Sequence, residues 1–346
     1  MPDCLLVRLR PNGPWRLGPA SGARDRVDSV CHSDTLYSAL CWSMRSLGML
    51  EEWLDATARD ESPEGPAVRL SSMLPWQADL LYVAGPRHLW PPPTSRLRTR
   101  GAQFIPNAVL PGLLAPPSAE GGPALEEDKW EVDGVSRCLI RSGRKGAFAG
   151  PFRYSLRSNA AVDRMANGHV GVHQTACLEF SPNAGLWCVA QFRSTIDQEK
   201  WGSKVEACFR LLADSGIGGE RSRGWGHAEV EEFRMVDLST LLLGRHVEQA
   251  PENPAYWLLS LFSPAEGESI DWDKGNYSLL TRSGRVESPA AWGAAKKSLQ
   301  MVAEGSVLVA SKKPVGRAHD VAPDGFPHAV FRFGFAVSIP LPWRTP

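Results

Sequence analysis

The sequence predicts an α+β fold made of two ferredoxin-like (RRM-like) domains in tandem. Up to residue 233, strand and helix patterns follow in the order strand, helix, strand, strand, helix, strand, which is the order of one ferredoxin-like unit. After residue 233, further strand patterns recur with weak helical periodicity, as in a second, degraded unit. The length of 346 residues suffices for two cores. We therefore predict domains at 1–233 and 234–346.

Alternating apolar residues and turn residues predict the strands of both units. A long insert, from about residue 90 to about 170, divides the first unit. In the first unit we expect strands at Cys4–Arg10, Val68–Pro75, Leu80–Val83, Ala176–Phe180, Leu186–Phe192 and His227–Phe233. In the second unit we expect strands at Tyr256–Phe262, Tyr277–Arg282, Ser306–Ala310 and Ala329–Ile339.

The first helix begins with a cap signal. Ser33 is a suitable N-cap, and Asp34 sits favourably in the first turn against the helix dipole. The stripe expected to be buried is Leu36, Leu40, Met44 and Leu47, and Gly48 ends the helix. A structural helix start is one interpretation. The alternative is a phosphate site at the helix N-terminus, where Ser33 is flanked by Arg24, Arg26 and His32.

A glycine-rich loop follows the second helix, which apolar spacing predicts at 200–214. The loop, Gly216–Gly226, holds five glycines in eleven residues together with two arginines and a tryptophan. Glycines allow sharp turns and close approach, guanidinium groups fork onto phosphates, and an indole stacks on a base. We therefore predict an RNA-binding loop with contacts from Gly216, Gly218, Gly219, Arg221, Ser222, Arg223, Gly224 and Trp225.

The loop has two other interpretations. A Walker-type phosphate loop requires a Lys-Ser/Thr pair and a following helix, but here no lysine follows and the next residues alternate like a strand. The order helix, loop, strand is also the reverse of that found in nucleotide-phosphate loops. A long hairpin or bulge without any ligand remains an alternative.

The insert changes character along its length. Trp90–Pro93 opens it, and 111–131 is rich in proline, glycine and acid, which predicts a mobile loop. Basic residues interleaved with aromatic ones then predict contact with single-stranded nucleic acid, with a solvated charged face as the alternative. The basic residues are Arg137, Arg141, Arg144, Lys145, Arg153, Arg157 and Arg164, opposed only by Asp163; the aromatic ones are Phe148, Phe152 and Tyr154.

Composition excludes several classes of function. The formal net charge is zero, so RNA binding must come from local patches or from partners. The seven cysteines form no C-x-x-C pair, which predicts reduced, mostly buried thiols and a cytoplasmic protein. The N-terminus carries no export signal, and no apolar run approaches the roughly 18–20 residues of a membrane span.

No catalytic motif is present among the eight histidines or the carboxylates, and no metal or cofactor is expected. A metal-independent ribonuclease leaves almost no sequence signature, because one positioned proton carrier suffices. His32 and His227 are the candidates for such a role, with phosphate contact or packing as the simpler interpretation.

Several stretches together resemble one family. The loop Gly216–Gly226 is similar to the G-rich loop of the RAMP superfamily of CRISPR systems. The resemblance narrows to the fourth Csm subunits of type III-A effector complexes through the stretches Ser33–Leu36, Ser71–Pro75, Ala161–Arg164, Tyr277–Gly284, Lys296-Lys297, Glu304–Val307 and Phe331–Gly334. One departure is Arg16-Leu17-Gly18, where the family tends to have His or an aromatic residue before its glycine.

The resemblance implies a non-catalytic subunit that binds and caps the repeat-derived 5′ tag of crRNA. Its neighbours would be the large polymerase/nuclease subunit and the first backbone RAMP subunit, with target RNA contacted only indirectly. The insert would be a thumb that pushes between nucleotides. Two rival hypotheses remain: an endoribonuclease that processes CRISPR precursor RNA, and an interaction module that docks the large subunit without touching RNA.

Overall fold

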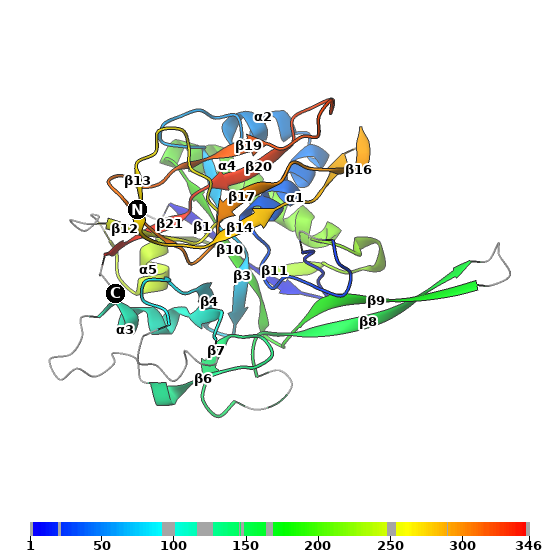
Figure 1. Ribbon diagram of the computed structural model, residues 1–346, viewed down its shortest axis with the longest axis horizontal. Coiled ribbons are helices and arrows are strands. Elements are labelled where there is room, and N and C mark those ends of the chain that lie inside the picture. Colours follow the sequence, from blue (N-terminus) through cyan, green and yellow to red (C-terminus); the bar gives the residue numbers. More distant parts are fainter. Residues whose placement is uncertain are drawn as a thin grey trace.

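The computed structural model describes residues 3–19, 22–91, 101–115, 127–144, 146, 149–163, 169–247, 254–288 and 290–343. Their strands gather into two main antiparallel sheets, and a long hairpin projects from one side (Figure 1). The predicted α+β class is therefore confirmed.

The N-terminal sheet has the strand order β11-β1-β10-β3-β4-β5, and β2 also pairs with β10. The strands are β1 Cys4–Pro11, β2 Val68–Leu70, β3 Leu74–Gln77, β4 Leu80–Ala84, β5 Phe104–Pro106, β10 Ala184–Phe192 and β11 Ala228–Val236. In the centre, Val7 of β1 lies opposite Cys188 of β10 and Phe233 of β11. Every residue of β10 is buried, as expected of a strand covered on both faces.

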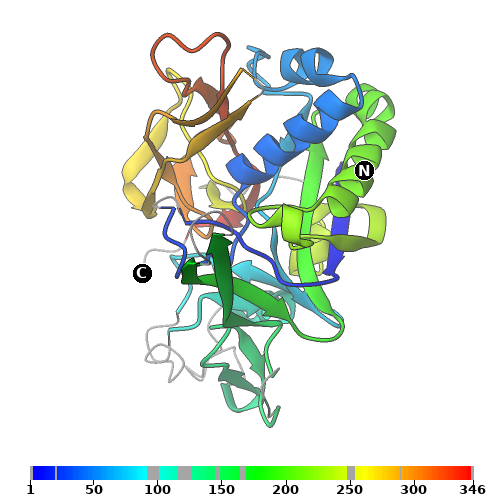
Figure 2. The same ribbon diagram turned by 90° about the vertical axis from the view of Figure 1, so that its right-hand side faces the viewer.

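Helices α1 Ser33–Ser46 and α4 Thr195–Ser215 pack on this sheet, and α2 Leu50–Ala56 packs against α1 (Figure 2). The Ser194 hydroxyl caps α4 by accepting the Asp197 N–H at 3.1 Å, and Trp201, Val205, Cys208, Phe209 and Leu212 are buried, as predicted. Leu47, predicted to be buried, follows the last turn of α1 and is 42% exposed. None of the helices within the described residues is long and apolar enough to span a membrane.

The insert contains small elements and one long hairpin. They are η2 Asn107–Val109, α3 Leu110–Leu114, η3 Glu127–Lys129, β6 Trp130–Val132, β7 Leu139–Arg141, β8 Phe152–Asp163 and β9 His169–Phe180. The predicted mobile loop is thus partly helix and strand, and its residues 116–126 lie outside the described ones. Strands β8 and β9 pair over twelve residues each, a length of roughly 40 Å, and project beyond the body (Figure 1).

The C-terminal part begins after the short helix α5 Leu238–Leu243 and is built from strands alone within its described residues. Its main sheet has the order β13-β18-β12-β21, made of β12 Pro254–Leu258, β13 Ile270–Asn276, β18 Val307–Ala310 and β21 Ser338–Pro342. Three two-stranded ribbons flank it: β14 Leu279–Arg282 with β17 Leu299–Val302, β15 Arg285–Ser288 with β16 Ala291–Ala295, and β19 Gly316–Asp320 with β20 Phe331–Phe335.

Three predicted strands are shorter or divided, and the prediction of their length was wrong. The pattern at 68–75 divides into β2 and β3, the pattern at 256–262 stops at Leu258, and the pattern at 329–339 divides into β20 and β21. Serine side chains occupy two of these breaks. The Ser71 hydroxyl accepts the Val189 N–H at 2.9 Å, and the Ser260 hydroxyl accepts the Val337 N–H at 2.9 Å, so both replace ladder hydrogen bonds.

One apolar core joins the two parts of the chain. Trp257, Phe333 and Ile339 belong to the same buried cluster as the N-terminal strands, and Phe333 stacks on Tyr37 of α1 with ring centres 4.3 Å apart. The division into domains at residue 233 therefore stays a prediction. All seven cysteines are free thiols and six of them are buried, as predicted.

Candidate nucleic-acid interface

The glycine loop is a closed turn fixed to the segment after β1. Gly216 ends α4, and the Ile217 N–H donates to the Gly226 carbonyl at 3.0 Å. The Gly226 N–H donates to Pro14 at 2.9 Å, and the Gly219 N–H donates to Arg16 at 2.9 Å. A Cβ on Gly226 would lie 2.2 Å from the Ile217 carbonyl oxygen, so only glycine fits there.

The loop divides its side chains between the core and the surface. Ile217 is in the core, and Trp225, predicted as an RNA contact, is only 9% exposed, so most of its indole packs against the protein. Residues 221–223 form the 3-10 turn η4, whose side chains face outward. Arg221 and Ser222 border an open depression of about 710 Å³ lined also by Gly218, Gly219, Arg285 and Glu287.

Fewer backbone donors are available in this loop than its glycine content suggests. The N–H groups of Ile217, Gly219, Arg223, Gly224, Trp225 and Gly226 all donate to carbonyls of the protein. The arginine side chains are the main outward donors. Arg223 lies 3.0 Å from the Glu220 carboxylate, and Arg221 forms an ion pair with Glu287 of β15.

Arg16 ties the loop to the hairpin, a role that the sequence did not indicate. Its guanidinium is buried and donates to the carbonyls of Ala23, Arg24 and Ala176 at 2.9, 3.0 and 3.2 Å, respectively. Its own carbonyl accepts the Gly219 N–H. One residue therefore holds together the segment after β1, strand β9 and the glycine loop. The only sequence signal was the departure from the family pattern at this position.

The predicted basic residues of the segment after β1 and of the hairpin come to lie near one another. The side chains of Arg24 and Arg26 are exposed, and the Arg24 carbonyl accepts the Ala176 N–H of β9 at 2.8 Å. A groove of about 820 Å³ runs between this segment and the base of the hairpin, and Arg26, Tyr154 and Leu156 contribute to its lining together with the acids Asp25 and Asp28. Tyr154 and Leu156 are 43% and 54% exposed, so apolar surface adjoins one cation and two carboxylates.

The hairpin arginines are neutralised by a residue that we did not predict. Glu179 of β9 forms ion pairs with Arg153, at 2.7 Å, and with Arg157. Burial would raise the pKa of the Glu179 carboxyl, but the two guanidinium groups outweigh it and hold this pKa below its usual range. Within residues 137–164 Asp163 is the only acid, but strand pairing brings Glu179, from outside that stretch, opposite Arg153.

The remaining predicted basic residues lie away from this groove or outside the described part. Arg141 is 3.8 Å from Asp79, and Arg144 donates to the Gln77 side chain at 2.8 Å, both next to the turn between β3 and β4. Lys145, Phe148 and Arg164 lie outside the described residues.

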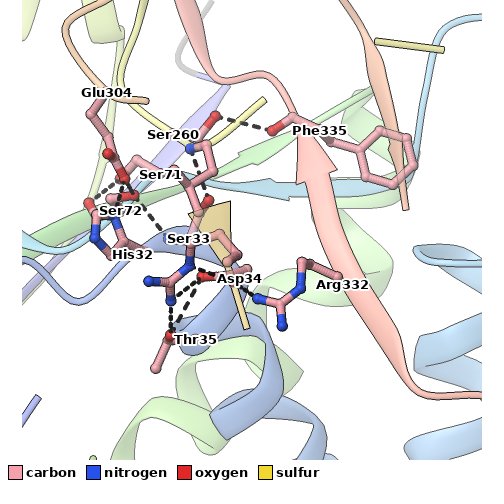
Figure 3. A network of polar contacts seen from close by, with 12 residues as sticks. His32, Ser33, Asp34, Thr35, Ser71, Ser72, Ser260, Glu304, Arg332 and Phe335 are labelled. Carbon is pink, nitrogen blue, oxygen red and sulfur yellow. Dashed lines mark hydrogen bonds and ion pairs between the residues drawn. The ribbon is translucent and has the colours of Figure 1, made fainter. Parts of the chain in front are cut away.

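The N-terminus of α1 is occupied from within the protein (Figure 3). The helix begins at Ser33 itself with His32 as N-cap residue, so the prediction of Ser33 as N-cap was wrong. Ser33 is fully buried: its N–H donates to the Ser72 hydroxyl at 2.8 Å, and its hydroxyl accepts the Leu261 N–H at 3.1 Å. An external phosphate cannot reach these groups without opening the core.

His32 is paired in the same network. Its Nδ1 lies 2.8 Å from a Glu304 carboxylate oxygen, which the Ser72 hydroxyl also contacts (Figure 3). Burial alone would lower the pKa of His32, but the Glu304 charge reverses this and raises it. The pKa of Glu304 is correspondingly lowered, since His32 outweighs the opposite effect of burial.

Asp34 forms the centre of a buried ion cluster that joins α1 to the C-terminal part. Arg282 of β14 contacts both carboxylate oxygens at 3.0 Å, and Arg332 of β20 contacts one of them. Burial would raise the pKa of Asp34, but Arg282 and then Arg332 lower it to about 2. The start of α1 is therefore a structural junction between the two parts.

The geometry gives no support for a catalytic pair. His32 is held by Glu304 in the interior, and His227 lies at the start of β11, where its carbonyl accepts the Trp15 indole N–H at 3.1 Å. Among the residues that the structure describes, no group of three or more His, Cys, Asp or Glu side chains could hold a metal ion.

Comparisons with known proteins agree with this architecture. Residues 251–341 match the model of the CRISPR Csm4 C-terminal domain. The fold matches a chain of the Csm3-Csm4 subcomplex of a type III-A CRISPR-Cas interference complex, with a TM-score of 0.62 and 16% identity over 99% of each chain. It also matches a chain of a Csm1-Csm4 cassette in complex with cA4, with a TM-score of 0.56 and 17% identity over 99% of this chain and 98% of that one. A comparison with curated proteins returns no match.

Csm4 is the one subunit named in both of these matching structures. The family model that matches residues 251–341 is also that of a Csm4 domain. At these identities the structural likeness shows the fold, and it does so over nearly the whole chain. The resemblance to the fourth Csm subunits is thus confirmed.

Proposed function

We propose that this chain, which has the fold and the C-terminal domain of Csm4, is the subunit that binds and caps the crRNA 5′ tag in a type III-A complex. In that role it bridges the large subunit, Csm1, and the backbone subunit, Csm3, which are the companions named for its two structural relatives. It acts without catalysis, in the cytoplasm. The observation that carries the proposal is the match to Csm4 at residues 251–341 together with the shared fold over 99% of the chain.

The surface arranged around Arg16 supports RNA as the ligand. Through Arg16, the glycine loop and the base of the hairpin are parts of one rigid arrangement with exposed arginines on each part. In the groove beside the hairpin, Tyr154 and Leu156 supply an apolar face for bases, while Asp25 and Asp28 lie beside Arg26, so the phosphate contacts are assigned to the arginines of the loop and the hairpin. Ser33 and His32 are not among the proposed contacts, because both are engaged inside the protein.

The ion pairs of this surface fit a site that exchanges partners. The two loop arginines form ion pairs at the surface, Arg221 with Glu287 and Arg223 with Glu220. Exposed pairs of this kind contribute only about 0–1 kcal/mol, whereas a well-formed charge-assisted bond to phosphate contributes about 1.5–3 kcal/mol. A phosphate can therefore replace the carboxylate at little cost.

The test is replacement of Arg221 and Arg223 together by Ala in the reconstituted complex. We expect crRNA affinity, measured by gel shift at low salt, to fall by tens-fold or more, because two charge-assisted contacts are removed. The matched control replaces Arg210 and Arg234, two exposed arginines paired with acids elsewhere, and should leave affinity unchanged. Unchanged affinity in the Arg221/Arg223 variant would refute the assignment of the loop.

Two further assays separate the rival functions. Purified protein incubated with repeat RNA in EDTA should give no site-specific cleavage; cleavage lost on changing His32 or His227 would establish a nuclease. Crosslinking along the crRNA tag should reach residues of the glycine loop. Absence of any crosslink there, with the large subunit still bound, would favour a module that docks protein only.

A further inference from the structure

A second pocket lies on the other side of strand β15 from the glycine loop, between α1, α2 and the C-terminal ribbons. Its volume is about 470 Å³, within the range of roughly 300–1,000 Å³ typical of small-molecule sites. Tyr37, Cys41 and Arg45 follow one another at intervals of four residues along α1, so they share the helix face that lines the pocket.

The walls of this pocket offer a flat apolar surface. Trp42 is 38% exposed, although it lies beside Leu50, Leu54 and Val286 in the lining. The Arg45 guanidinium lies over its indole ring, 5.9 Å from the centre. An exposed indole beside aliphatic side chains can stack with a planar ring.

The pocket also contains two cationic side chains that have no ion-pair partner among the described residues. Within the described residues, the half-buried Lys296 ammonium makes no hydrogen bond or ion pair, and the Arg45 guanidinium likewise donates to no acceptor. Burial lowers the pKa of Lys296, and the charge of Arg332 lowers it further. The adjacent Lys297 differs, since it is exposed and pairs with Asp324 at 2.8 Å.

The acidic groups of the lining are already paired. Glu51 binds Arg59 at 2.9 Å, and Glu287 binds Arg221 of the glycine loop. His328 is held between the Ala329 carbonyl, 2.9 Å from Nδ1, and the Ser288 hydroxyl, 2.8 Å from Nε2. The unpaired groups are thus two cations beside an aromatic wall, which suits an anion attached to a flat ring.

This pocket adjoins the depression beside the glycine loop. Val286 and Glu287 line both of them, so only strand β15 separates the two. A strand of RNA held at the glycine loop could therefore place its terminal nucleotide in the pocket.

We infer that this pocket binds one nucleotide, with its base against Trp42 and its phosphate between Lys296 and Arg45. The nucleotide is either the terminus of a bound RNA or a free nucleoside monophosphate. In the first case the inference rests on the proposed function; in the second it stands alone.

The experiment uses the full-length chain and two probes: each of the four nucleoside monophosphates, and the tag RNA as a short oligonucleotide. Binding is measured by calorimetry for wild type, Lys296→Met, Lys296→Arg, Trp42→Ala and the matched control Lys297→Met. We expect Lys296→Met to weaken binding by about tenfold or more, Lys296→Arg to restore most of it, and Lys297→Met to change it less than about twofold. In wild type, the bound probe should protect Lys296 but not Lys297 from an amine acetylating reagent, read by mass spectrometry.

The outcomes separate the sources and the proposals. Loss of monophosphate binding in Lys296→Met identifies a free nucleotide; loss confined to the oligonucleotide identifies an RNA terminus. The inference is overturned if neither probe responds to Lys296→Met, if both lysine variants respond alike, or if only binding of the large subunit changes. If Arg221 and Arg223 govern crRNA affinity and Lys296 does not, the inference fails while the proposed function stands. If the complex binds no crRNA, the proposed function fails and the monophosphate arm still decides the pocket.

Discussion

Replacement of Asp34 by Ala should be among the most destabilising single substitutions in this protein. Asp34 is only 3% exposed and balances two buried guanidinium groups, those of Arg282 and Arg332. Removing one member of a buried ion cluster leaves uncompensated charge and costs about 3–5 kcal/mol in the free energy of unfolding. Because those guanidinium groups come from β14 and β20, the substitution also loosens the contact between α1 and the C-terminal part.

The lowered pKa of Asp34 reflects the same interaction. It falls from 3.8 to about 2 on folding. A lowered pKa stabilises the folded state above the unfolded value, which corresponds here to about 2 kcal/mol at neutral pH. That stabilisation is lost as the pH falls from about 4 to about 2. The Ala variant should lack this acid-dependent part of the transition.

The assay is urea unfolding of the full-length chain followed by tryptophan fluorescence, with the slope m required to stay constant. The control is Asp55→Ala, which removes an exposed partner of Arg59 and should cost less than about 1 kcal/mol. Replacing all three cluster residues with apolar ones of similar volume should recover much of the loss. If Asp34→Ala costs no more than Asp55→Ala, the cluster does not hold the two parts together.

Three other changes have defined outcomes. In urea unfolding, Gly226→Ala should lower the free energy of unfolding several-fold more than Gly224→Ala. Both glycines have positive φ, but only a Cβ at Gly226 would lie 2.2 Å from a carbonyl oxygen, whereas Gly224 has open space and its substitution should cost about 1–2 kcal/mol. Equal costs would contradict the closed-turn geometry. His32→Gln should lower the free energy of unfolding most between about pH 4.5 and 6.5, where both members of the His32–Glu304 pair are charged. The stabilisation is lost as pH rises through the raised pKa of His32 and as pH falls through the lowered pKa of Glu304. A pH-independent cost would show that the pair is not charged. Glu179→Gln should remove the negative charge that competes for Arg153 and Arg157, so crRNA binding by the complex should tighten several-fold in gel shifts at low salt. Glu206→Gln on α4 is the control. Weaker binding would mean that Glu179 positions the arginines and does not compete for them.

Local patterns were sufficient for the first strand, the helix before the glycine loop and the loop itself. Strand β1 is a short apolar run, helix α4 carries a helical period of apolar residues, and the glycines mark a turn that only glycine can form. These features depend on residues close in sequence, which is why they could be predicted. The lengths of the C-terminal strands could not, because the Ser260 side chain ends one strand through a contact with Val337.

The site residues were harder to predict for the same reason. Ser33 and Asp34 have the local pattern of a helix cap, yet their partners, Leu261, Arg282 and Arg332, are more than 200 residues away along the chain. Glu179 neutralises the hairpin arginines only through strand register. Arg16 has no motif at all, since its donors contact backbone carbonyls whose positions depend on the fold.

The carboxylates beside the surface arginines also bear on how the proposed RNA binding should respond to salt. When a phosphate binds a cationic side chain that has no other partner, counterions are released from the nucleic acid. The logarithm of the affinity then falls linearly with the logarithm of the salt concentration, with a slope of about −0.7 per contact for single strands. On this protein, dissolved salt also weakens the pairs of Arg221 with Glu287 and of Arg153 with Glu179, which compete with the phosphates. The two effects oppose each other. We therefore expect the affinity of this protein for RNA to fall less steeply with ionic strength than the number of surface arginines would indicate.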